Sequence, residues 1–132
     1  MRHASPDQAT IRIRITCGED IAIGQGKADL LQGILEAGSI SGGARKLGMS
    51  YRKAWLLVDE MNRCFKAPLV EARLGGARGG GAVVTALGLE ALNRYRELQT
   101  QAWDAVRKPF REFERLLGPA PAQDAAPKRV LE

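Results

Sequence analysis

The spacing of apolar residues divides this chain into short strands and amphipathic helices. Apolar and polar residues alternate over residues 10–16, which is typical of a half-buried strand, and residues 21–23 are expected to return as a short partner strand. The period then lengthens to that of a helix over residues 27–38, which ends at a glycine. A second short helix is expected over residues 39–48, with a serine as its N-cap.

Two further helices flank a glycine-rich hairpin. Residues 51–65 place apolar side chains on one helical face, and residues 69–74 and 82–85 are predicted to pair as strands around a turn of glycines. A long helix follows over residues 86–117, and Pro109 is expected to kink or break it near Lys108. Without a break this helix would be about 48 Å long, more than a domain of this size covers. We therefore expect its distal part to pack on a second copy of the chain.

This order of elements predicts a mainly α protein with small β hairpins, an α+β fold. A short helix, a tight turn, a second helix and a hairpin form the plan of a winged helix-turn-helix, here followed by a long C-terminal dimerisation helix. We expect a flexible tail over residues 1–9, the winged domain over 10–118 and a disordered tail over 119–132. Gly42 and Gly43 within so short a helix indicate the close approach of another backbone or of a ligand.

The distribution of charge makes this plan more specific. The chain carries a net charge of +5 and has a pI near 9.6, which alone favours a polyanionic partner only slightly. Between Arg45 and Lys66, however, six cationic residues stand against two acidic ones, so the excess lies in the helix-turn-helix. We therefore expect double-stranded DNA as a partner.

Residue types that support catalysis or metal binding are scarce. The chain has one histidine, and Cys17 and Cys64 form no metal-ligating pair and are expected to be small buried residues. The glycine-rich turn lacks the lysine and hydroxyl residue of a nucleotide-binding loop. We expect no enzyme, no cofactor and no metal site. Without an apolar signal core or a long apolar run, we expect a cytoplasmic protein that does not span a membrane.

Several short motifs resemble one family. The motifs are Gly38-Ser-Ile-Ser41, Gly48-Met-Ser-Tyr51, Ala54-Trp55, Asp59-Glu-Met-Asn62 and the glycine-rich hairpin followed by Thr85. Together, over roughly residues 11–100, they resemble the N-terminal DNA-binding domain of ModE, the molybdate-responsive transcriptional regulators. The resemblance implies a homodimeric winged-helix regulator linked to molybdenum metabolism. Leu56 departs from the family pattern, which tends to have aspartate there, and we expect no molybdate-sensing portion within the 132 residues.

The helix-turn-helix plan also assigns roles to individual residues. The first turn of the second helix is expected to contact bases and phosphates, and serines before each helix are expected to cap it, to bind phosphate, or both. Trp55 is expected to be buried beside the core face, with contact to a base as the alternative. The residues predicted to bind DNA are Ser39, Ser41, Arg45, Lys46, Ser50, Tyr51, Arg52, Lys53, Arg73 and Arg78.

The long C-terminal helix carries the predicted dimer contact. Its apolar residues recur every three or four positions, and those assigned to dimerisation are Leu98, Ala102, Val106, Phe110 and Phe113. A second function stays open at this point. The chain could be a helical interaction module that acts through a partner regulator, its basic face being solvated and not bound to DNA.

Overall fold

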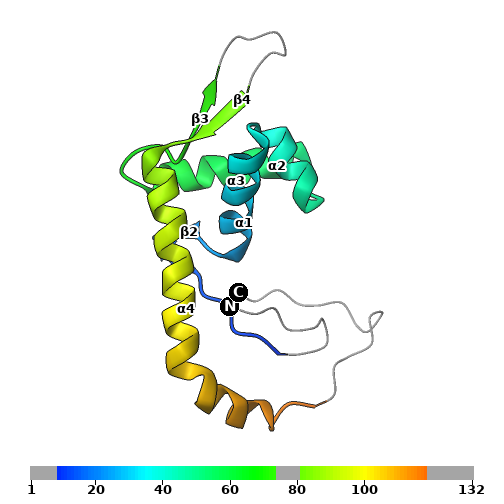
Figure 1. Cartoon of the computed structure of the whole chain (residues 1–132), viewed down its shortest axis with the longest axis vertical. Coiled ribbons are helices and arrows are strands. Elements are labelled where there is room, and N and C mark those ends of the chain that lie inside the picture. The colour runs from blue at the N-terminus through cyan, green and yellow to red at the C-terminus, as the bar shows by residue number, and fades with distance from the viewer. Residues whose placement is uncertain (1–8, 74–80, 119–132) are drawn as a thin grey trace. The chain divides into compact units, whose positions relative to one another are not determined.

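Two small hairpins and four helices make up the described part of the chain (Figure 1). The structure, a computed structural model, describes residues 9–73 and 81–118. Residues Arg12–Gln99 form one compact unit, and the described residues 9–11 and 100–118 belong to a second. The order confirms the predicted α+β fold, with the helix-turn-helix between the hairpins. The elements are β1 (Ile15–Cys17), β2 (Asp20–Ile23), α1 (Gln25–Ala37), α2 (Ile40–Leu47), α3 (Tyr51–Cys64), β3 (Val70–Arg73), β4 (Gly81–Val84) and α4 (Ala86–Glu114).

The core of the first unit collects apolar side chains from all three of the longer helices. Leu31 and Ile34 of α1 are fully buried, and Met61 of α3 joins them. Leu92 and Tyr95 come from the first half of α4 and are also buried. Burying a large aliphatic or aromatic side chain contributes about 1.5–3 kcal/mol, so this cluster fixes how the helices of the unit pack.

The crossing of α1 and α2 depends on two glycines. A Cβ atom on Gly43 would lie 2.9 Å from the backbone nitrogen of Ile34, and one on Gly33 would lie 3.2 Å from the Cα of Gly43. The two backbones therefore meet directly. The close approach predicted from the glycines of the short helix is confirmed for Gly43, and the partner is another backbone.

Polar side chains fix the base of the second hairpin, the wing. Asn62 on α3 accepts hydrogen bonds at Oδ1 from the amides of Leu69 (2.8 Å) and Val70 (3.3 Å), and its Nδ2 donates to the Val70 carbonyl. On the other strand, the amide of Ala82 donates to the carbonyl of Gly38 at 3.0 Å. One strand of the wing is thus attached to α3 and the other to the residue that ends α1.

A charged pair lies inside the first unit. Lys27 of α1, its side chain only 6% exposed, donates to Oε1 of Glu60 at 3.0 Å, and the Glu60 side chain is 23% exposed. Oε2 of Glu60 accepts from the backbone amide of Ile21 at 2.7 Å. The Ile21 amide, followed by Lys27, lowers the pKa of Glu60 below its ordinary value. This pair connects α1, α3 and β2, and the sequence pattern did not predict it.

The first strand is shorter than predicted. The alternation over residues 10–16 suggested a strand, but β1 begins only at Ile15 because its partner β2 has four residues and the register shifts between Ile15 and Thr16. The residues before β1 do not pair with β2 but contact α4. The hydroxyl of buried Tyr95 donates to the Ile13 carbonyl at 2.6 Å, which fixes that segment against α4.

A kink or a break was expected at Pro109, and the structure excludes the break. Helix α4 is continuous across this residue and ends at Glu114. A proline inside a helix removes its own N–H from the helical hydrogen bonds and its ring crowds the carbonyl four residues earlier, but its φ is compatible with a helix, so the bonds of its neighbours can carry the helix on. The rings of Trp103 and Phe110 lie in edge-to-face contact, with centroids 5.6 Å apart, and span the proline turn.

Candidate nucleic-acid interface

The helix-turn-helix is built from two serine-capped helices. Oγ of Ser39 accepts from the amide of Gly42 at 2.9 Å, and Oγ of Ser50 accepts from the amide of Lys53 at 3.0 Å. Gly48, with φ of +67°, ends α2 in the left-handed conformation that glycine adopts most readily. The capping roles of both serines are confirmed, while Ser41 is exposed and lies 3.5 Å from Ser39, Oγ to Oγ.

Helix α3 separates a buried face from an exposed face. Ala54, Val58 and Met61 are buried and hold the helix on the core. The rest of the helix carries cationic and apolar side chains together, and its exposed residues are Tyr51, Arg52, Lys53, Trp55, Leu56, Asp59 and Arg63. The buried face therefore fixes which side chains the helix presents outward.

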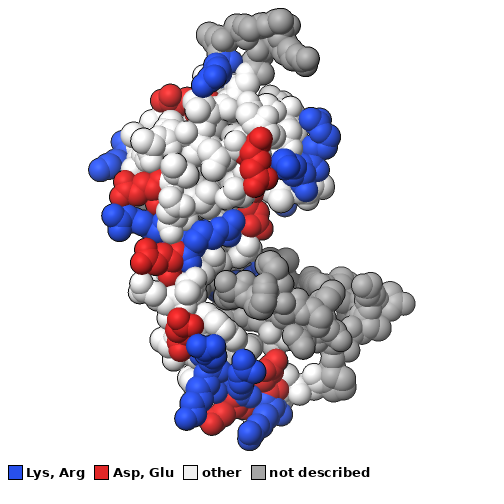
Figure 2. Space-filling model, viewed as in Figure 1, with Lys and Arg blue, Asp and Glu red and all other residues white. Residues whose placement is uncertain are grey.

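Cationic side chains gather around the start of α3 and the end of α2. Figure 2 shows Lys and Arg at the edge of the first unit where α2 lies, with acidic side chains beside them. Lys46 pairs with Glu36 at 3.5 Å, both about half exposed. Arg45, Arg52 and Lys53 are exposed and form no ion pair with any residue that the structure describes. These three charges are available for an anionic partner.

The far end of α3 differs in this respect. Arg63 donates to Asp59 at 2.8 Å and lies 3.5 Å from Asp20 on the first hairpin. Its charge is thus balanced by two carboxylates within the molecule. The unpaired positive charge of α3 is confined to its N-terminal turn, the end that enters the major groove in helix-turn-helix proteins.

Trp55 is not buried, so the expectation of burial is wrong. Its side chain is 39% exposed, and its ring meets that of Tyr51 edge to face, with centroids 6.4 Å apart and planes at 87°. Successive residues of a helix are rotated by about 100°, so Trp55 lies well away from the core contact of its neighbour Ala54. The core stripe of α3 is too narrow to include it.

Only part of the predicted wing contact can be placed. Arg73 is the last residue of β3, is exposed and pairs in register with Gly81. Arg78 and the rest of the glycine-rich turn lie outside the described residues, as do residues 1–8 and 119–132 of the two predicted tails. Of the two arginines predicted to contact DNA from the wing, the structure therefore describes only Arg73.

The distal half of α4 buries none of its described side chains. Ala102, Val106 and Phe110 are half-buried, and Phe113 is 57% exposed. Leu98, one turn earlier in the first unit, is likewise exposed. The predicted dimerisation residues thus fall along α4 at spacings of three or four residues.

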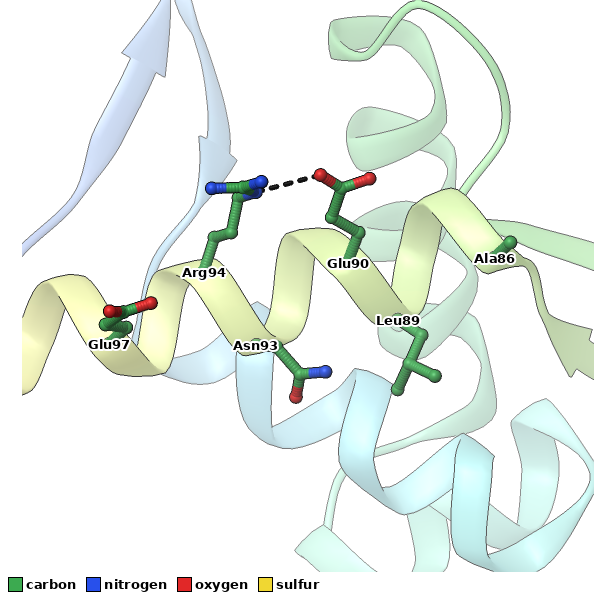
Figure 3. A pocket seen from close by; sticks show the side chains of 6 residues that line it. All are labelled: Ala86, Leu89, Glu90, Asn93, Arg94 and Glu97. Atoms are coloured by element: carbon green, nitrogen blue, oxygen red, sulfur yellow. Dashed lines mark hydrogen bonds and ion pairs between the residues drawn. The ribbon is translucent and has the colours of Figure 1, made fainter.

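The start of α4 forms a shallow hollow lined by both polar and apolar side chains (Figure 3). Glu90 and Arg94 form an ion pair at 2.8 Å within it. The lining side chains all come from this one helix and include no nucleophile with a neighbouring base. They are Ala86, Leu89, Glu90, Asn93, Arg94 and Glu97.

Other kinds of site find little support in the part of the chain that the structure describes. No group of three or more histidine, cysteine or acidic residues there could hold a metal ion. None of the helices described is both long enough and apolar enough to cross a membrane. Cys17 is exposed, contrary to the expectation of burial, and Cys64 is half-buried, with the pKa of its thiol raised by desolvation.

Comparison with known proteins finds relatives of one kind. The chain is 39% identical over 101 residues to the molybdenum-pterin-binding protein MopB of Rhodobacter capsulatus, which covers 76% of this chain and 36% of that protein. It is 35% identical over 102 residues to the DNA-binding transcriptional dual regulator ModE of Escherichia coli K12, and this match covers 75% of this chain and 39% of that protein. It is 32% identical over 113 residues to the transcriptional regulator ModE of Yersinia pestis, and this match covers 83% of this chain and 43% of that protein. No family model matches the chain. The matched region is less than half the length of each of these relatives.

Proposed function

This chain is a relative of the ModE-type transcriptional regulators over about three quarters of its length, and from that relationship we propose that it binds double-stranded DNA through α2 and α3. The observation that carries the proposal is the set of unpaired cations Arg45, Arg52 and Lys53 around the capped start of α3. Phosphates supply most of the affinity in such complexes, and exposed, unpaired cations are the groups that bind them.

In this proposal each element has a separate role. The N-terminal turn of α3 enters the major groove, where Arg52 can donate two hydrogen bonds to a guanine. Arg45 and Lys46 of α2, together with Ser41, contact the backbone, and Arg73 on the wing contacts a neighbouring phosphate. The names of the relatives connect them with molybdenum. We therefore propose that the chain acts in the cytoplasm on genes of molybdenum metabolism.

Removing two cations from α3 tests DNA binding. In Arg52→Ala/Lys53→Ala we expect affinity for genomic fragments that co-purify with the protein to fall roughly 30-fold, because a base contact and a phosphate contact are lost. The slope of log affinity against log salt should become shallower by about one, since one fewer phosphate is neutralised. Fluorescence anisotropy titrations at several salt concentrations measure both quantities. Both side chains are exposed, so the melting temperature should not change.

A variant with the same loss of charge is the control. Arg94→Ala/Arg107→Ala removes two surface cations from α4, each held only in a pair within that helix. Its affinity for DNA should stay within about threefold of the wild type if position, and not net charge, decides binding. Equal weakening in both double variants contradicts the assignment. A wild-type chain that binds no DNA at low salt but retains a protein partner supports the interaction module instead.

We further propose that the chain is a homodimer joined through the distal half of α4. Val106→Asp places a charge at the centre of the apolar row and should convert the dimer to a monomer, because an unpaired charge is strongly disfavoured in an apolar contact. Light scattering after gel filtration should then give one chain mass, 14.3 kDa, where the wild type gives twice that value. Ala105→Asp, at the exposed neighbouring position, should remain dimeric. A monomeric wild-type chain would refute the proposal.

A further inference from the structure

The exposed face of α3 carries more apolar surface than a solvated helix needs. Tyr51 is 55% exposed, Trp55 39% and Leu56 60%, all within the first two turns. Single exposed apolar residues are common on protein surfaces, but three within two turns of one helix, two of them with their rings in contact, indicate a contact surface. Unpaired cations adjoin them at Arg52 and Lys53. The partner must therefore combine negative charge with apolar groups.

The two rings are held in a defined arrangement before any partner binds. Tyr51 is the first residue after the Ser50 cap, and Trp55 follows one helical turn later in edge-to-face contact with it. Such ring pairs are attractive beyond the area they bury, which restricts both side chains. A restricted aromatic surface loses little conformational freedom on binding, so it suits recognition.

DNA offers one apolar group in the groove that admits a helix. Of the four bases, only thymine presents a methyl group in the major groove, while the phosphates on either side supply the negative charge. The major groove is about 12 Å wide and accepts an α-helix, so a ring on the leading face of α3 can reach a base edge. Charge and apolar surface on α3 therefore match thymine-containing DNA, and the similarity of this chain to a DNA-binding regulator favours DNA over an acidic protein with apolar side chains.

We propose that Tyr51 and Trp55 form an apolar surface that selects sites by contact with thymine methyl groups in the major groove. This inference rests on the proposed binding of DNA and adds the determinant of sequence preference. Arg52 and Lys53 supply affinity and a guanine contact, whereas the aromatic pair distinguishes thymine from cytosine at adjacent positions. Trp55, which the apolar pattern alone assigned to the core, becomes a specificity-determining residue.

Replacing thymine with uracil in the DNA tests the proposal without changing the protein. Uracil pairs as thymine does but lacks the methyl group. A site enriched by the wild-type chain from a random duplex pool should bind about fourfold more weakly for each contacted methyl that is removed, given the free energy of burying one such group. Titrations of the thymine and uracil forms of one duplex, at one salt concentration, give this ratio directly.

Variants then assign the effect to the rings. Trp55→Ala should bring the ratio of the two affinities close to one, and Trp55→Phe should retain part of it. Leu89→Ala, on α4 with a similar exposure of 41%, should keep the wild-type ratio. Circular dichroism shows that each variant is folded.

The outcomes separate this inference from the function on which it rests. Equal affinity for the thymine and uracil forms overturns methyl recognition but leaves DNA binding in place. An unchanged ratio in folded Trp55→Ala also overturns it, because another residue must then contact the methyl. A wild-type chain that binds no duplex at low salt overturns both proposals, and an acidic protein captured instead identifies the other kind of partner.

Discussion

Replacing Lys27 with methionine is expected to lower the free energy of unfolding by about 3 kcal/mol, because it leaves the carboxylate of Glu60 without its buried cation. Methionine keeps the apolar stem and nearly the volume of lysine, so the loss reports the charge and not a cavity. The value lies at the lower end for broken buried pairs because Glu60 is 23% exposed and keeps its bond from the Ile21 amide. Urea denaturation of the wild type and of the variant measures the difference.

A second substitution at Glu60 isolates the charged pair. In Lys27→Met/Glu60→Gln no charge is left in the site, so stability should recover in part relative to Lys27→Met alone. Arg107→Met, which breaks an exposed pair with Asp104, should cost under 1 kcal/mol. A double variant that is no more stable than Lys27→Met would show that the uncompensated carboxylate is not the cause.

The same pair makes stability depend on pH in a defined direction. The pKa of Glu60 is lowered in the folded state, so below about 4.5 the unfolded chain binds more protons than the folded chain. The stabilisation is therefore present above this pH and is lost as the pH falls through the folded pKa. In Glu60→Gln this component is absent, and unfolding curves between pH 3 and 6 should be correspondingly flatter than those of the wild type.

Gly88→Ala is expected to destabilise the protein by about 2–3 kcal/mol through overpacking. A Cβ atom at this position would collide with the carbonyl oxygen of Leu69 and approach Cγ1 of Val84 at 2.8 Å. The Leu69 carbonyl cannot move freely, because it accepts from the amide and the hydroxyl of Thr85 at the base of the wing. The gain in helix propensity, up to about 1 kcal/mol, offsets only part of the cost.

Gly26→Ala is the matched control for this substitution. Gly26 also lies near the start of a helix, but a Cβ atom there meets nothing within 4 Å. This variant should be neutral or more stable by about 0.5 kcal/mol, since alanine restricts the unfolded chain. If both variants shift the denaturation midpoint in the same direction and by the same amount, the contact with Leu69 is not what matters at Gly88.

The elements that sequence reasoning located correctly are those with a local physical signal. Serines before α2 and α3, the glycine that ends each of the first two helices, and the glycine-rich hairpin each mark a boundary by their own backbone chemistry. Apolar residues at helical spacing then gave most of the core faces of α1 and α3, although Leu35 of the apolar row in α1 is exposed. These signals were sufficient for the order of elements and for the helix-turn-helix that carries the candidate site.

The errors arose where distant residues decide the outcome. The exposure of Trp55 depends on how much of α3 the core covers, and the length of β1 depends on the few residues of its partner strand. The buried Lys27 was missed because its partner Glu60 is 33 positions away, and lysine alone indicates a solvated residue. The spacing of apolar residues within one segment contains no information about contacts with distant segments.

The separation of α3 into two faces has a consequence for how such a chain can evolve. Ala54, Val58 and Met61 are buried and fix the helix on the core, while Tyr51, Arg52 and Trp55 are exposed. Mutations on the outer face can therefore alter which DNA sites are preferred without reducing the fraction of folded protein in the cell. A duplicated gene could acquire a new set of targets through a few substitutions on one side of a single helix, with the scaffold inherited intact.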